Sequence, residues 1–251
     1  GSSAMRRLGV GVAVVLSVAA CTPVNEEAGK PVGHAFQLLK YPTAQSDPAP
    51  EPQGRSPFGD YALEVSGSVT YLGETSELPG AGVMTVGPGP RRGELKIEQY
   101  YRGDRFPYET GVVSAGEGKP STLDAITIVN PLDSRVTLQC AVDGGIALAD
   151  IEGERELTGT CGGGSKAYGH VRAEGSRKAT WRDKPVELVR TVVDLTVTGA
   201  SSGEIHQVNE VPKDSAVASF PLYTSIDVNM TAQGISLTQK LQRHVLPKVK
   251  D

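Results

Sequence analysis

Aromatic side chains are scarce in this chain, because only 13 of its 251 residues are Phe, Trp or Tyr. A hydrophobic core therefore has to be built mainly from Val, Leu and Ile. Dense clusters of basic residues are missing as well, and the formal net charge is −4. Nucleic-acid binding requires a basic patch or stripe that neutralises phosphates, so we expect no nucleic-acid partner.

Long hydrophobic runs are also absent. The longest mostly apolar stretch, residues 8–20, has thirteen residues, follows Arg6-Arg7 and ends at Cys21. A transmembrane helix needs about 20 residues, so this stretch is too short to remain as a membrane span. A basic start, a short apolar segment and small residues at its end are typical of a secretory signal peptide. Residues 1–4, which precede Met5, are interpreted as a cloning scar.

The end of this run, Val18-Ala19-Ala20-Cys21, resembles the lipobox of bacterial, actinobacterial-type exported lipoproteins. The resemblance implies cleavage before Cys21, diacylglycerol on the Cys21 thiol and acylation, for example with palmitate, of the new N-terminus. Several acyl chains hold a protein firmly on a bilayer. The expected location is therefore extracytoplasmic, with Cys21 anchored in the cell membrane. An ordinary secretory signal that contains a cysteine is the alternative.

Three segments follow from this interpretation. Residues 1–20 are the scar and the signal peptide, residues 21–57 are the lipidated cysteine and a tether, and residues 58–251 are a folded domain. The tether holds seven of the 17 prolines, a composition that favours extended chain over a packed core. Residues 32–41, VGHAFQLLKY, are its most apolar part, and we interpret them as an arm that packs on the domain.

From residue 58 onward, apolar and polar residues alternate with period two, which predicts strands with one buried face. Turns rich in Gly and Pro separate these runs. We expect an all-β domain, a single curved antiparallel sheet forming a half-barrel, a barrel or a sandwich, with little helix. The clearest strands are predicted in residues 60–72, 94–102, 135–142, 187–199, 219–231 and 234–247.

Two cysteines remain once Cys21 is assigned to the lipid anchor. Cys140 and Cys161 both lie in predicted strands, and an exported protein with two cysteines favours a disulfide between them. Closing a loop of about twenty residues stabilises a fold by ~3 kcal/mol. A redox-active pair would favour a Cys-x-x-Cys spacing, which the chain lacks.

Candidate catalytic and metal-binding patterns are weak. Gly199 to Gly203 matches the Gly-x-Ser-x-Gly nucleophile elbow around Ser201, but the elbow requires a helix after it, and the residues that follow predict a strand. We therefore interpret Ser201 to Gly203 as a turn. The four histidines are scattered, without metal-ligand spacing, so we expect no metal site and no cofactor.

Two clusters combine aromatic and basic residues and are candidate ligand-binding sites. The first contains Tyr100, Arg102, Arg105, Phe106 and Tyr108. Alternation along the strand predicts that Tyr101 is buried and Tyr100 exposed. The second is Trp181 with its neighbouring cations, which could contact an anionic lipid. The alternative for Trp181 is an indole that caps the core.

The combination of lipobox, proline-rich tether, antiparallel strands and one disulfide resembles exported lipoproteins, among which the LolA/LppX-like carriers fold as open half-barrels. That resemblance implies a non-enzymatic protein that binds a lipid or another hydrophobic ligand in its curved sheet. This chain departs from the pattern because it predicts no long helix to plug the sheet. The alternatives are an envelope accessory protein that binds a partner protein through a sheet face or edge, and a hydrolase centred on Ser201.

Overall fold

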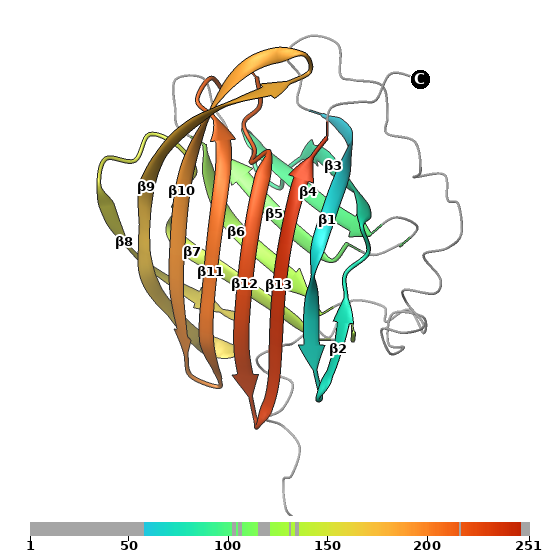
Figure 1. Cartoon of the computed structure of the whole chain (residues 1–251). Coiled ribbons are helices and arrows are strands. Elements are labelled where there is room, and N and C mark those ends of the chain that lie inside the picture. Colours follow the sequence, from blue (N-terminus) through green and yellow to red (C-terminus); the bar gives the residue numbers. More distant parts are fainter. Residues whose placement is uncertain are drawn as a thin grey trace, which may run out of the picture.

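The protein is described here from a computed structural model, which covers residues 58–101, 104, 107–114, 121–130, 132–133, 136–215 and 217–246. Residues 1–57, which include the predicted signal peptide and tether, lie outside these residues. Thirteen strands follow one another along the chain (Figure 1): β1 (Gly59–Tyr71), β2 (Glu74–Glu77), β3 (Ala81–Pro88), β4 (Glu94–Tyr101), β5 (Glu109–Ser114), β6 (Thr122–Val129), β7 (Thr137–Ala147), β8 (Glu154–Cys161), β9 (Ser165–Trp181), β10 (Lys184–Thr198), β11 (Ser201–Pro212), β12 (Tyr223–Ala232) and β13 (Ile235–Val245). Between β8 and β9 lies a single 3-10 turn, η3 (Gly162–Gly164), and no α-helix occurs in the described residues.

All thirteen strands form one antiparallel sheet that closes on itself. From β3 to β13 each strand pairs with the next, and β13 returns to pair with β1 over nine residues, from Leu63↔Val245 to Tyr71↔Leu237. β2 and β3 pair with successive parts of the same side of β1 in one continuous register. The all-β curved sheet expected from the sequence is confirmed, and among the forms left open the sheet adopts a closed one.

The alternation of side chains places an apolar face of most strands inside the closed sheet, whereas the short, polar β2 has no buried residue. β1 and β12 show this most plainly, with Leu63, Val65 and Val69 buried on the first and Val228 and Met230 on the second. Tyr101 is buried and Tyr100 only partly so, as the alternation predicts. Phe220 and Leu222 are also buried, but they precede β12 instead of belonging to it.

The phase of the alternation changes within β10 because β9 carries an extra residue. Val189 pairs with Ser176 and Thr191 with Ala173, so Glu174 and Gly175 of β9 oppose Arg190 alone. Gly175 has φ +86°, the left-handed conformation typical of a glycine in a bulge. Unbroken alternation over the predicted strand 187–199 would bury Val189 together with Val193, and this expectation is wrong, because Val189 is only half-buried while Leu188 is buried.

The same bulge bends the β9–β10 hairpin. A bulge increases the local twist and turns a strand pair away from its previous direction. Beyond it, the hairpin extends past its neighbours and curls over the upper end of the closed sheet (Figure 1). Trp181 and Lys184 form the last pair before the hairpin turn.

The pairing between β7 and β8 is the shortest among the consecutive strands that close the sheet. It comprises three residue pairs, Cys140↔Cys161 to Val142↔Gly159, although β8 has eight residues. Asp143-Gly144-Gly145 directly follows the predicted strand 135–142, where a Gly-rich turn is expected, but these residues lie inside β7, where the register with β6 shifts. The disulfide between Cys140 and Cys161 joins the first of these pairs, with the two Cα atoms 4.1 Å apart. The predicted disulfide is confirmed, and it cross-links β7 and β8 where only three residue pairs join them.

Candidate functional site

A cleft of about 400 Å³ lies beneath the curled β9–β10 hairpin. One face of the hairpin forms one wall, and the start of β12 and the end of β13 form the other. Ligand sites typically measure about 300–1,000 Å³ and combine apolar walls with a few polar groups. The apolar lining residues are Ala179, Trp181, Val186, Leu188, Leu222 and Val245.

The hairpin lines this cleft because its inward face is regular beyond the bulge. Arg177 pairs with Leu188 and Ala179 with Val186, so the four side chains lie on one face. Trp181 follows on the same face and is only 7% exposed. The indole therefore belongs to the packed interior of the cleft, as the core-capping alternative expects.

Aromatic and cationic contacts hold the hairpin tip against β1. The Arg182 guanidinium lies 4.1 Å from the centre of the Trp181 ring and 5.9 Å from the centre of the Tyr61 ring. Tyr61 in turn packs edge-on against Phe220, with ring centres 5.2 Å apart. Cation–π contacts of this kind each contribute about 0.5–2 kcal/mol. The hairpin thus spans the end of the sheet and reaches the first strand.

Polar and charged side chains also line the cleft or lie next to it. The exposed Arg177 forms an ion pair with Glu210, whose side chain is 3% exposed. The hydrogen bond to this carboxylate raises the pKa of Arg177 and outweighs the effect of its partial burial. The rings of Tyr223 and His244 pack 4.7 Å apart between β12 and β13. A molecule with an apolar body could therefore lie in the cleft while its polar end meets these groups.

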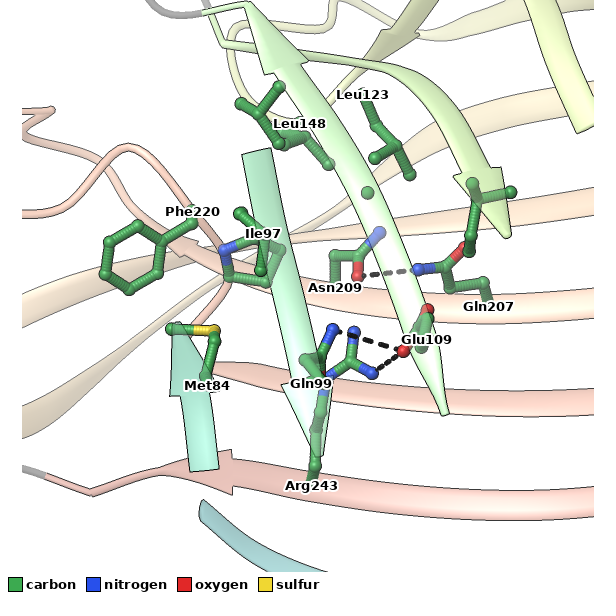
Figure 2. A pocket seen from close by; sticks show the side chains of 14 residues that line it. Met84, Ile97, Gln99, Glu109, Leu123, Leu148, Gln207, Asn209, Phe220 and Arg243 are labelled. Atoms are coloured by element: carbon green, nitrogen blue, oxygen red, sulfur yellow. Dashed lines mark hydrogen bonds and ion pairs between the residues drawn. The ribbon is translucent and has the colours of Figure 1, made fainter. Parts of the chain in front are cut away.

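A second group of polar residues lies inside the closed sheet (Figure 2). Glu109 of β5 and Arg243 of β13 form an ion pair across the interior, with exposed fractions of 3% and 7%. Gln99 donates a hydrogen bond to Glu109 at 3.2 Å, and the Tyr108 hydroxyl donates one to Gln99 at 3.2 Å. Tyr108 also stacks on Tyr101, with ring centres 4.2 Å apart.

Facing this group, Asn209 of β11 accepts hydrogen bonds from Gln207 and from Thr224, both at 3.1 Å. Its Nδ2 is buried and has no hydrogen-bond partner among the described residues. The cavity between the two groups measures about 30 Å³, which is room for about two water molecules at roughly 10–15 Å³ each. This part of the interior has space for ordered water but not for an acyl chain.

The predicted aromatic-basic cluster is divided by the fold. Tyr108 points into the interior, whereas Tyr100 lies on the opposite face of β4 and donates a hydrogen bond to Glu98 at 2.9 Å. Arg102, Arg105 and Phe106 lie outside the described residues, as does Cys21. The described aromatics of this cluster thus do not line one common surface, and neither of them lines the cleft that contains Trp181.

Ser201 begins β11 directly after the β10–β11 turn. The residue is fully buried, and its hydroxyl and backbone N–H both contact the Ser165 hydroxyl. The hairpin expected around Gly199 to Gly203 is present between β10 and β11. Its turn consists of Gly199 and Ala200, two residues before the turn expected at Ser201 to Gly203. A strand follows Ser201, and the exposed hydroxyl of a nucleophile elbow is not formed. His206 contacts Asp194 at 2.5 Å on the outer face.

Arg177 is one of the cations expected around Trp181, whereas sequence reasoning missed His244 at the cleft and the interior ion pair. A signal for the latter was present, because Arg243 is in phase with the buried Leu241 and Val245. Glu109 is likewise in phase with Val113 of the same strand. A charged residue in the apolar phase of a strand indicates a buried pair or a functional group.

Comparisons of the chain with protein-family models, with curated proteins and with solved structures found no match in any of the three. Within the described ranges, no three His, Cys, Asp or Glu side chains are grouped so that they could hold a metal ion. The same residues contain no helix long and apolar enough to cross a membrane.

Proposed function

We propose that this protein is a non-enzymatic extracytoplasmic lipoprotein that binds an amphipathic ligand, such as a lipid, in the cleft beneath the β9–β10 hairpin. The observation that carries the proposal is the cleft itself, with about 400 Å³ of space and a lining that combines apolar with polar side chains. Its volume falls within the range of ordinary ligand sites. The signal peptide and lipobox pattern that ends at Cys21 supports the membrane-anchored location.

The ligand is assigned to this cleft and not to the centre of the sheet. Around the Glu109–Arg243 pair the interior leaves only about 30 Å³. An acyl chain placed there would also have to displace the hydrogen bonds of buried charged groups, which is costly. The cleft offers about 400 Å³ and six apolar lining residues, and a ligand there leaves the Glu109–Arg243 pair intact.

The test is binding of a fluorescent fatty acid to the full chain and to two matched variants. Val186→Phe adds volume to the cleft wall, while Val112→Phe makes the same change in β5, away from the lining residues. We expect Val186→Phe to weaken binding on the order of tenfold, which corresponds to 1.4 kcal/mol. Val112→Phe is expected to leave the affinity unchanged. No binding to the unmodified chain, or equal binding by both variants, would contradict the proposal.

The edge of β8 favours a second candidate function, the binding of an envelope protein by strand addition. Residues 154–158 of β8 pair with β9 but have no strand partner on the β7 side among the described residues. An extended segment of a partner could add to such an edge through backbone hydrogen bonds. Hydrogen exchange of residues 154–158 would slow on addition of that partner, and unchanged exchange would count against this function.

A further inference from the structure

The chain enters the folded domain at the margin of the cleft. Leu63 of β1 pairs with Val245, which lines the cleft, and the Leu246 N–H donates a hydrogen bond to the Ala62 carbonyl. Tyr61 contacts Arg182 at the hairpin tip. The residues that precede β1 therefore begin next to the cleft and not at the far end of the sheet.

The segment before β1 contains one apolar stretch of suitable length. Residues 32–41, which we call the arm, read VGHAFQLLKY and include Phe36, Leu38 and Leu39. Sixteen residues separate the arm from Phe58, and at about 3.3 Å each they span up to roughly 50 Å. That reach is ample for a site that adjoins the first strand.

Covalent connection gives the arm an advantage over any free molecule. A segment on a short linker has an effective concentration in the mM range at a neighbouring site. The flanking stretches are polar and rich in proline, so the arm is the part of the segment that gains most from leaving water. The apolar walls of the cleft, which include Leu188 and Leu222, match it chemically.

From these observations we infer that the arm of the same chain docks in the cleft and competes there with the external ligand. The inference rests on the proposed function only for the identity of the competitor, since docking itself needs no ligand. It gives the cleft a built-in regulator, because a ligand must displace the arm before it can bind.

Site-specific photo-crosslinking in the full chain tests the docking. A benzophenone side chain replaces Leu38 in one variant and Ala44, outside the arm, in a control. We expect crosslinks from position 38 to peptides that contain residues 177–188 or 222–245, and few from position 44. The chain is mixed with an isotope-labelled copy, so that crosslinks within one chain are separated from crosslinks between chains. Crosslinks to other surfaces, or only between chains, would overturn the inference.

A binding measurement separates this inference from the proposed function. The double change Leu38→Asp with Leu39→Asp should raise the affinity for the fluorescent fatty acid on the order of tenfold, since it removes an intramolecular competitor. The matched change Ala44→Asp with Gln45→Asp should not alter it. Crosslinking from position 38 without any fatty-acid binding would refute the proposed function and keep the docking. Fatty-acid binding that neither double change affects would refute the competition.

Discussion

Arg243 and Glu109 are oppositely charged side chains in the interior of the closed sheet, and each neutralises the charge of the other. Burial works to lower the pKa of Arg243, but the attraction of Glu109 and the hydrogen bonds to Glu109 and Tyr108 outweigh it, so the pKa is raised. The surroundings of the guanidinium therefore favour its charged form. Because a buried charge without a partner is costly, the two residues depend on one another.

Replacing Arg243 by Met is expected to destabilise the fold by about 3–5 kcal/mol, because Glu109 is left buried without its cation. Urea unfolding followed by circular dichroism gives the free energy of unfolding. The double change Arg243→Met with Glu109→Leu should recover most of the loss, since no charge then remains inside. A single variant that loses less than ~1 kcal/mol would show that the pair is not buried as described.

Tyrosine ionisation offers a second test at the residue scale. Burial, above all, raises the pKa of Tyr101 and of Tyr108, and burial together with Glu98 raises that of Tyr100. A group whose pKa is higher in the folded state stabilises the fold below its unfolded pKa of about 10, and this stabilisation is lost as the pH rises further.

We therefore expect the free energy of unfolding to fall as the pH rises above about 10, and these tyrosines to ionise at a higher pH than free tyrosine in an ultraviolet titration. Tyr108→Phe removes one such group and should make the decrease less steep. A free energy of unfolding that stays constant over this range would contradict the burial of these phenols.

At the scale of elements, close contacts between strands depend on glycine. A Cβ on Gly169 of β9 would collide with the Asp194 carbonyl oxygen of β10. Gly87 of β3 is also a strand glycine, but a Cβ there meets no atom within 4 Å. The two positions therefore form a matched pair.

Gly169→Ala is expected to destabilise the protein by about 1–3 kcal/mol, because one strand must move. Gly87→Ala should be neutral or stabilising by up to ~1 kcal/mol, since it restricts the unfolded chain. Thermal and urea unfolding compare the two. Equal effects of the two changes would mean that β9 and β10 do not approach as closely as the structure shows.

The disulfide stabilises the short pairing of β7 with β8. Changing Cys140 and Cys161 together to Ala should cost about 3 kcal/mol, from the entropy regained by the unfolded chain. Hydrogen exchange should quicken in residues 140–142 and 159–161, while β12 and β13 stay protected. Reduction of the unmodified protein serves as a control and should give the same pattern. Uniform loss of protection around the whole sheet would contradict a local role.

Strand positions could be predicted better than their irregularities. The period-two pattern identified β1, β12 and β13, because one face of each is apolar and the other polar. The bulge at Gly175 could not be predicted, since it depends on how β9 is paired with β10. β9 was not predicted as one strand either, because polar side chains dominate its outer half, where the hairpin leaves the sheet.

At the scale of the whole molecule, the closure of the sheet was left open by the sequence for a physical reason. Alternation tells which face of a strand is buried, but a half-barrel, a barrel and a sandwich all bury one face. Closure is decided by the pairing of β1 with β13, elements at opposite ends of the domain. The cleft also depends on this closure. The pairing of β1 with β13 places Tyr61 of β1 near the cleft, where Arg182 at the tip of the β9–β10 hairpin contacts it.

The proposed function needs this closed form. In an open sheet the concave face itself would be the binding surface, as the resemblance to half-barrel carriers implies. Here the space around the central ion pair is small, and the larger space lies under the hairpin. The proposed ligand-binding role therefore belongs to the end of the sheet that the β9–β10 hairpin covers.

Native mass spectrometry of the protein purified from the envelope of its own cell tests the central claim most directly. We predict a population that carries one noncovalently bound amphipathic molecule, which is missing from the Val186→Phe variant prepared in the same way. A protein that is free of ligand in every preparation, or a ligand that Val186→Phe retains in full, would contradict the account.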